Sequence, residues 1–243
     1  MIWRIYLQKA RNENAAGNTE KAIENMDKML RFHPSVNAKV LFGYYLLQHG
    51  RIKKAREVFD KFIMNDCRVL KPEKRTKDGK IKLNRREILA KTNYALLLWK
   101  EGDIDGAVEL LEYVHSKGHT TNVYCNLGFL YILQGDLDKA LAYNEEAYDF
   151  SPEHNGICDN LGCTYLMRGN FQAAKEIYEE ISEHKKQPSF PECYYNYGRV
   201  LAKTGDKKGA KEMFEKALSL PFNGFSNVKK EQVEEALRKL KEE

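Results

Sequence analysis

Residues 121–154, TNVYCNLGFLYILQGDLDKALAYNEEAYDFSPEH, decide the fold of this chain. They read as two short amphipathic helices, with Leu127 and Tyr131 one turn apart on the apolar face of the first. Gly135 can adopt the left-handed conformation that ends a helix, and Asp136 can cap the helix that follows. Two helices of this length cannot bury a core alone, so the unit requires neighbours.

The turn of this unit recurs along the chain. Six glycines each precede an alanine by five residues: Gly17 with Ala22, Gly50 with Ala55, Gly102 with Ala107, Gly135 with Ala140, Gly169 with Ala174 and Gly205 with Ala210. The steps between these glycines are 33, 52, 33, 34 and 36 residues, a period near 34 with one insertion. A fixed period of this size predicts a stacked array of helix pairs. The predicted repeats span 3–35, 36–69, 88–120, 121–154, 155–188 and 191–224, and a polar-faced helix over 227–243 caps the stack.

This pattern resembles the tetratricopeptide repeat family. The residues that match it are the six alanines above, the first-helix glycines Gly43, Gly128, Gly162 and Gly198, the aromatics Phe59, Tyr178 and Phe214, and the closing prolines Pro34 and Pro152. The resemblance covers about 3–65 and 88–224. It implies an all-α, right-handed α-solenoid that forms one superhelical domain over 1–243. The fold hosts many functions, so the resemblance names no particular partner.

The composition agrees with an array of helices that have solvent-exposed faces. Charged residues make up 31% of the chain and hydrophobic residues 42%, with a net charge of +5. The five cysteines, at 67, 125, 158, 163 and 193, form no C-x-x-C pair, and we expect them to be reduced in a cytoplasmic protein. The chain shows neither a secretory signal nor an apolar run long enough for a membrane span. An abrupt start at Met1 leaves open an upstream anchor in a longer protein.

The insertion at 68–86, RVLKPEKRTKDGKIKLNRR, carries nine basic and two acidic residues, which leaves about −2 on the rest of the chain. A solvated excursion, either a mobile loop or a small hairpin around Asp78-Gly79, is one interpretation. The other interpretation is a basic patch that binds nucleic acid or anionic lipid, because clustered basic side chains attract phosphate groups. The segment has no aromatic residue for base stacking, which argues against sequence-specific RNA recognition. The proposed patch consists of Lys71, Lys74, Arg75, Lys77, Lys80, Lys82, Arg85 and Arg86.

A second stripe of the first helices carries the candidate binding site. When each first helix is numbered from its start, position 6 is asparagine in four consecutive repeats, at Asn93, Asn126, Asn160 and Asn196. In arrays that this chain resembles, the stripe lines a concave groove, where an amide can pair with a peptide's C=O and N–H. The alternative is that asparagine is merely common here and stays hydrated. The other groove candidates that we single out are Leu96, Phe129, Leu133, Met167, Arg199 and Lys203.

These groove residues suggest what the ligand carries. Leu96, Phe129, Leu133 and Met167, together with Cys163, would form an apolar middle, although packing against adjacent helices is the competing interpretation. Arg199 and Lys203 lie one helical turn apart and could hold a carboxylate. The sequence therefore predicts a ligand with apolar side chains at its centre and an acid near the repeat 6 end.

Several other chemistries are not expected. Relatives that clamp C-terminal carboxylates of chaperones place lysine at position 5, where this chain has Leu7, Val40, Thr92, Cys125, Asp159 and Tyr195. His115 and His119 have metal-ligand spacing, but Gly118 lies between them and no third ligand is placed. No catalytic motif is present, and we expect neither a metal nor a cofactor.

The sequence thus predicts a non-catalytic scaffold that binds an extended peptide or protein segment in its concave groove. The alternative is an adaptor that binds anionic surfaces through 68–86. Contact with a membrane would need that insertion or an upstream anchor. Nucleic acid is not the expected partner. A third possibility is self-association of the chain through the edges of its repeats.

Overall fold

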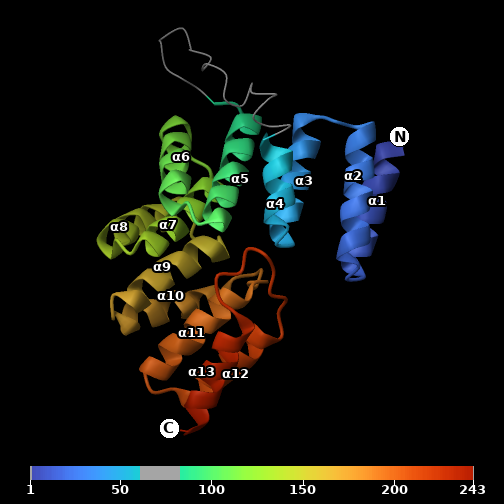
Figure 1. Cartoon of the computed structure of the whole chain (residues 1–243). Helices are drawn as coiled ribbons and strands as arrows, with labels where there is room; N and C mark the ends of the chain where they lie inside the picture. Colours follow the sequence, from blue (N-terminus) through green and yellow to red (C-terminus); the bar gives the residue numbers. More distant parts are fainter. Residues whose placement is uncertain (1, 61–82, 243) are drawn as a thin grey trace. The chain divides into compact units, whose positions relative to one another are not determined.

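The computed structural model describes residues 2–60 and 83–242 and contains only helices among them (Figure 1). This confirms the predicted all-α class. The helices are α1 (Ile2–Ala15), α2 (Thr19–Phe32), α3 (Val36–Gln48), α4 (Ile52–Val58), α5 (Arg85–Glu101), α6 (Ile104–Lys117), α7 (Thr121–Gln134), α8 (Leu137–Phe150), α9 (Asn155–Met167), α10 (Phe171–Glu183), α11 (Pro191–Lys203), α12 (Lys207–Leu218) and α13 (Lys230–Glu242).

The chain divides into two compact units, and each is described here by itself. Unit 1 runs to Gly118 and contains α1 to α6, whereas unit 2 begins at His119 and contains α7 to α13. Within each unit, consecutive helices pack as pairs, as expected of an α-solenoid.

All six turns predicted from the sequence connect the two helices of a pair. Their glycines have positive φ, from 67° at Gly50 to 92° at Gly102, a region that L side chains rarely adopt. In four of the turns the next residue caps the second helix through its side-chain oxygen: Asp103, Asp136, Asn170 and Asp206. The glycine reverses the chain and the cap starts the helix, so the local sequence sets the repeat boundary.

Each pair is closed by a small residue against a large one sixteen positions later. A Cβ on Gly162 would lie 2.8 Å from the Tyr178 ring, and one on Gly198 would lie 2.6 Å from the Phe214 ring. Gly43 and Phe59 make the same contact in unit 1. In the pair α7–α8 the aromatic is replaced by the fully buried Asn144, which faces Gly128.

Asn144 makes the α7–α8–α9 junction polar. Its amide nitrogen donates to Thr164 Oγ1 at 3.1 Å, and that hydroxyl donates to the carbonyl oxygen of Asn160 at 2.7 Å. Asn144 Oδ1 is buried without a hydrogen-bond partner. A buried oxygen without a hydrogen-bond partner is rare, so this pair differs from the glycine-to-aromatic contacts at Gly43, Gly162 and Gly198.

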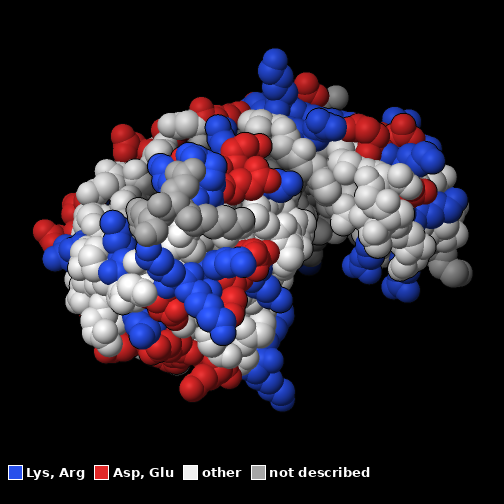
Figure 2. All heavy atoms as spheres, turned by 90° about the horizontal axis from the view of Figure 1, so that it is seen from below, with Lys and Arg blue, Asp and Glu red and all other residues white. Residues whose placement is uncertain are grey.

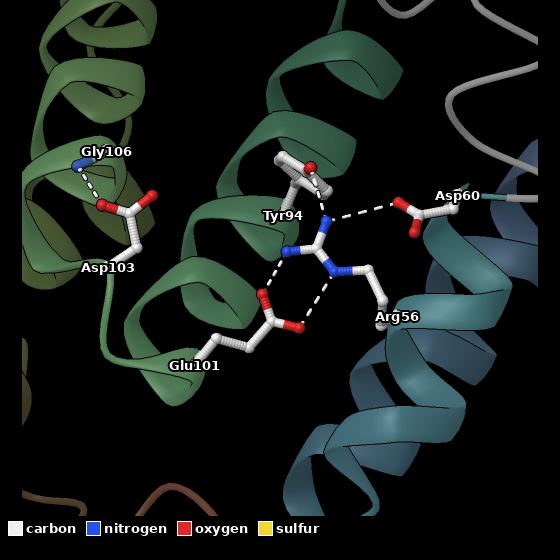
Figure 3. Close-up of polar contacts among 6 residues, drawn as sticks. All are labelled: Arg56, Asp60, Tyr94, Glu101, Asp103 and Gly106. Carbon is white, nitrogen blue, oxygen red and sulfur yellow. Dashed lines mark hydrogen bonds and ion pairs between the residues drawn. The ribbon is translucent and has the colours of Figure 1, made fainter.

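In unit 1, helices α4 and α5 are joined by a single arginine although they are separated in sequence by the insertion (Figure 3). Arg56 Nε donates to Glu101 Oε1 at 2.9 Å, and its Nη2 binds the other oxygen of the same carboxylate. Nη1 donates to the Tyr94 hydroxyl at 2.7 Å and to Asp60 Oδ1 at 3.3 Å. This bidentate fork fixes both helices, so repeat 3 packs on repeat 2 across the inserted segment.

In unit 2, the first helices α7, α9 and α11 pack side by side, and α8, α10 and α12 pair with them. The predicted capping helix is α13, whose Val233 is fully buried beside Phe214, with Ala236, Leu237 and Leu240 packed on the same cluster. A long connector between α12 and α13 returns past the start of α11 (Figure 1), where the backbone N–H of Asn227 donates to Glu192 Oε1 at 3.0 Å.

Candidate functional site

One face of unit 2 is formed by side chains from the three neighbouring first helices. We call it the first-helix face and define it by Phe129 and Leu133 on α7, Cys163 and Met167 on α9, and Arg199 and Lys203 on α11. Leu133 is 37% exposed and Met167 46%, which are high values for large apolar side chains. The face therefore combines an accessible apolar part with a basic end.

Two of the predicted amides bind the preceding repeat. Asn160 Nδ2 donates to the carbonyl oxygen of Cys125 at 2.7 Å, and Asn196 Nδ2 donates to Asp159 Oδ1 at 3.2 Å. Asn160 and Asn196 are only 6% and 8% exposed, whereas Asn126 is half-buried. These hydrogen bonds tie each first helix to the one before it, so the two nearly buried amides serve as contacts between repeats.

The basic end of the face is held in place by its own neighbours. Arg199 Nη1 donates to Asn196 Oδ1 at 3.4 Å, and its guanidinium lies 5.5 Å from the centre of the Tyr195 ring. Lys203 is exposed one helical turn further on. An arginine supported in this way is suited to recognition of a carboxylate.

The sequence analysis missed Asp159 as a residue of this face. Gly156, Asp159, Cys163 and Met167 follow each other at steps of three and four residues along α9, so they share one side of the helix. Asp159 is 7% exposed, and its Oδ1 accepts a hydrogen bond from the Tyr178 hydroxyl at 2.8 Å in addition to that from Asn196. The signal was available in the sequence, because Asp159 follows Gly156 by three residues and precedes Cys163 by four, which is the spacing of one helix face.

Burial raises the pKa of the Asp159 carboxyl to about 7. The nearby Glu192 raises it further, while the hydrogen bonds from Asn196 and Tyr178 oppose the shift. The thiols close by show no sign of nucleophilic activation, because burial raises the pKa of both Cys125 and Cys163 to about 12. The four cysteines of the described residues are all free.

The predicted residues of unit 1 occupy different environments. Asn93 is 6% exposed and Leu96 is 7% exposed, so both are largely buried within their unit. Arg85 and Arg86 lie exposed in the first turn of α5, which the Asn84 side chain caps. The remaining patch residues, Lys71, Lys74, Arg75, Lys77, Lys80 and Lys82, and the expected hairpin around Asp78-Gly79 lie outside the described residues.

Charges are mixed rather than segregated over the C-terminal part of the chain. Figure 2 shows lysine and arginine interspersed with aspartate and glutamate there. None of the helices in the described part is both long and apolar enough to cross a bilayer.

Comparison with known proteins identifies the repeats. Models of the tetratricopeptide repeat match residues 88–112, 121–154, 156–181 and 191–223. These matches begin at or within one residue of the starts that the glycine period predicts for the last four repeats.

Two relatives are similar over part of their length. BBSome complex member BBS4 of Bos taurus is 43% identical over 53 residues, 22% of this chain and 10% of that protein. Protein O-mannosyl-transferase TMTC2 of Homo sapiens is 32% identical over 111 residues, 44% of this chain and 13% of that protein. The matched segments thus span only about a tenth of each relative.

Solved structures share the fold at low sequence identity. The chain is similar to the Cut9–Hcn1 hetero-tetramer of the APC/C, with a TM-score of 0.69 and 17% identity over 98% of this chain and 42% of that one. PilW, a type IV pilus biogenesis factor, is similar with a TM-score of 0.65 and 14% identity, over 99% of this chain and 98% of that one. These structures share the fold, and the repeat matches show that the chain belongs to the tetratricopeptide repeat family.

Proposed function

We propose that this protein is an interaction scaffold that binds an extended peptide segment across the first-helix face of unit 2. Tetratricopeptide repeat proteins are typically protein-binding scaffolds, and the finer assignment to this face is our own. The observation that carries it is the exposure of Leu133 on α7 and of Met167 on the neighbouring helix α9. Large apolar side chains that are exposed on neighbouring helices gain free energy when a binding partner covers them.

The face also sets the character of the peptide. Adjacent packed helices lie about 8–10 Å apart, so three of them are spanned by about six extended residues. Apolar side chains would lie against Phe129, Leu133 and Met167, and a carboxylate would meet Arg199 and Lys203. The amide oxygen of the half-buried Asn126 supplies an acceptor for a backbone N–H group, whereas Asn160 and Asn196, only 6% and 8% exposed, would contribute only after rearrangement. In unit 1, Asn93 and Leu96 would contribute only after rearrangement, because both are buried.

A role in a multiprotein assembly is consistent with this proposal. The relative BBS4 is named as a member of a complex, and its similarity lies in a repeat segment. We extend to this chain only the general role of a protein-binding array, because the match covers 10% of that relative.

The test is selection from a random peptide display library, followed by affinity measurements on wild type and on Phe129→Ala with Met167→Ala. Truncating these side chains removes apolar contact area, and we expect dissociation constants to rise at least tenfold. Phe150→Ala is the matched control, because Phe150 is 48% exposed on the second helix α8. Equal affinities for wild type and the double variant would exclude this face as the binding site.

A further inference from the structure

We propose that Asp159 forms a subsite of the first-helix face that receives a cationic side chain, lysine or arginine, of the bound peptide. This inference rests on the proposed function and assigns a specificity that neither the fold nor the relatives supply. It adds a basic requirement at the middle of the peptide to the acidic one expected at Arg199 and Lys203.

The geometry of Asp159 carries the argument. Its Oδ1 is held by two donors, the Tyr178 hydroxyl from α10 at 2.8 Å and the Asn196 amide from α11 at 3.2 Å. These contacts fix the carboxyl group between three helices. The hydrogen bonds among the described residues give Oδ2 no donor, so one oxygen of this nearly buried group is left for a ligand.

No cation of the protein neutralises this carboxylate within the described part of the chain. The nearest arginine on the face, Arg199, donates instead to Asn196 Oδ1 at 3.4 Å. Glu192, at the start of α11, adds a second negative charge and is itself bound by the backbone N–H of Asn227. Burying an acid without a counter-charge is costly, and a cationic ligand would remove that cost.

The walls of the subsite suit an aliphatic stem. Gly156, one turn before Asp159, has no side chain, and Cys125 packs against it with its Sγ 2.8 Å from where a Cβ would be, so the surface beside Asp159 is uncharged. Cys163 is one turn after Asp159, and burial keeps both thiols protonated by raising each pKa to about 12. Lysine and arginine carry methylene stems that pack along such uncharged surface while the charged head reaches a partner.

The competing explanation is that Asp159 is only a brace between α10 and α11. Asp159→Asn separates the two, because the asparagine oxygen can still accept from Tyr178 and Asn196 while the negative charge is lost. A brace would leave ligand preference unchanged. A cation subsite would lose its preference for a charged side chain and keep its affinity for a neutral one.

The probe is a series of blocked hexapeptides of alanine and leucine in which lysine, norleucine or glutamate occupies each position in turn. We expect wild type to bind the best lysine peptide about tenfold more tightly than its norleucine counterpart, as for one charge-assisted hydrogen bond. Asp159→Asn should bind the two alike. Asp149→Asn, which alters an exposed acid on α8, should keep the wild-type preference.

A pH series gives a second readout that a structural brace would not produce. The groups facing Asp159 are Tyr178 on α10, Cys125 on α7, Cys163 on α9, and Glu192, Cys193 and Arg199 on α11. Burial raises the pKa of the thiols and of Tyr178, which therefore stay protonated, and it also raises the pKa of Glu192. The pKa of Asp159, raised to about 7, places its ionisation near neutrality. Affinity for the lysine peptide should therefore rise severalfold through pH 7 in wild type and stay level in Asp159→Asn.

The outcomes distinguish this inference from the proposed function. A lysine preference that persists in Asp159→Asn, or wild type that binds lysine and norleucine peptides equally, would overturn the cation subsite and leave the peptide-binding face standing. Wild type that binds none of the hexapeptides, and yields none from the display library, would overturn both. Thermal unfolding of each variant checks that the fold is retained.

Discussion

Two glycines of unit 2 meet different physical requirements. Gly135 ends α7 with a φ of 82°, and a Cβ added to it would meet no atom within 4 Å, so only its backbone conformation demands glycine. Gly162 lies inside α9 with helical backbone, and a Cβ there would lie 2.8 Å from the Tyr178 ring. Backbone strain therefore limits which residues can replace Gly135, and packing limits which residues can replace Gly162.

Substitution should separate these two causes. Gly162→Ala is expected to lower the free energy of unfolding by about 1–3 kcal/mol, because a buried ring must move. Gly135→Ala should cost about 1–2 kcal/mol, since alanine avoids the left-handed region. Gly135→Asn should cost less, because asparagine tolerates that conformation. Urea denaturation measures all three, and equal losses for alanine and asparagine at Gly135 would contradict the backbone explanation.

The raised pKa of Asp159 predicts an unusual pH dependence of stability. Burial raises it to about 7 from an ordinary 3.8, so between these values the folded chain keeps a proton that the unfolded chain has released. Stability from this group therefore falls as the pH rises from about 4 to about 7, by up to roughly 4 kcal/mol at 1.36 kcal/mol per unit. Asp159→Asn should remove the slope in denaturation at a series of pH values. The same slope in the variant would assign it to other groups.

At the level of single residues, the sequence indicated which positions form turns and close packing better than it indicated which atoms a side chain contacts. The turn glycines follow from spacing alone, and the structure confirms their positive φ. Gly43, Gly162 and Gly198 were matched only to the family pattern, and the structure shows the aromatic ring that each one contacts. The amides were predicted to face a ligand, but which atom an amide donates to depends on the neighbouring repeat. Asn160 meets a carbonyl oxygen 35 positions earlier, a partner that local sequence cannot indicate.

At the level of elements, the junction between α4 and α5 depends on a contact that bridges 45 positions of sequence. Arg56 is 29% exposed and Glu101 is 28% exposed, so the pair is partly shielded from water. The hydrogen bonds raise the pKa of the Arg56 guanidinium, first through Glu101 and then through Tyr94 and Asp60, so it stays charged. The predicted repeats 2 and 3 pack together through this fork.

Arg56→Ala is expected to destabilise unit 1 by about 1–3 kcal/mol, because Glu101 loses a bidentate partner in a partly shielded site. Arg56→Lys should recover only part of that loss, since an ammonium cannot form the fork. The control is Arg31→Ala, whose ion pair with Asp27 is 76% exposed at the arginine and should contribute less than about 1 kcal/mol. Equal effects at Arg56 and Arg31 in hydrogen exchange of α4 and α5 would contradict a special role for the fork.

The elements themselves were largely predictable, because each helix carries its own start and stop signals. The capping helix was expected over 227–243 and is observed at Lys230–Glu242. The connector before it was not expected to return to the start of α11, where Glu192 accepts the N–H of Asn227. This hydrogen bond joins residues 35 positions apart, a contact that local sequence cannot indicate.

For the whole molecule, the uneven distribution of charge bears on which binding mode operates. The chain has a net charge of +5, and residues 68–86 alone carry +7, so the remainder is slightly acidic. Most residues of that segment lie outside the described part, and its role stays a prediction. The first-helix face, which we propose binds a peptide, has Arg199 and Lys203 as the cations among its defining side chains, and its other defining side chains are uncharged.

Salt therefore distinguishes the two modes. Binding at the first-helix face should weaken by less than about tenfold when salt rises from about 50 to about 200 mM, because its contacts are mainly apolar. Binding of duplex DNA or anionic vesicles through the insertion should fall roughly 10³-fold or more if six or more of its cations contact phosphates. Replacing Lys71, Lys74, Arg75 and Lys77 with glutamine should abolish the second effect and leave the first intact. If those substitutions weakened peptide binding while Phe129→Ala with Met167→Ala did not, the insertion rather than the repeat face would be the principal binding element.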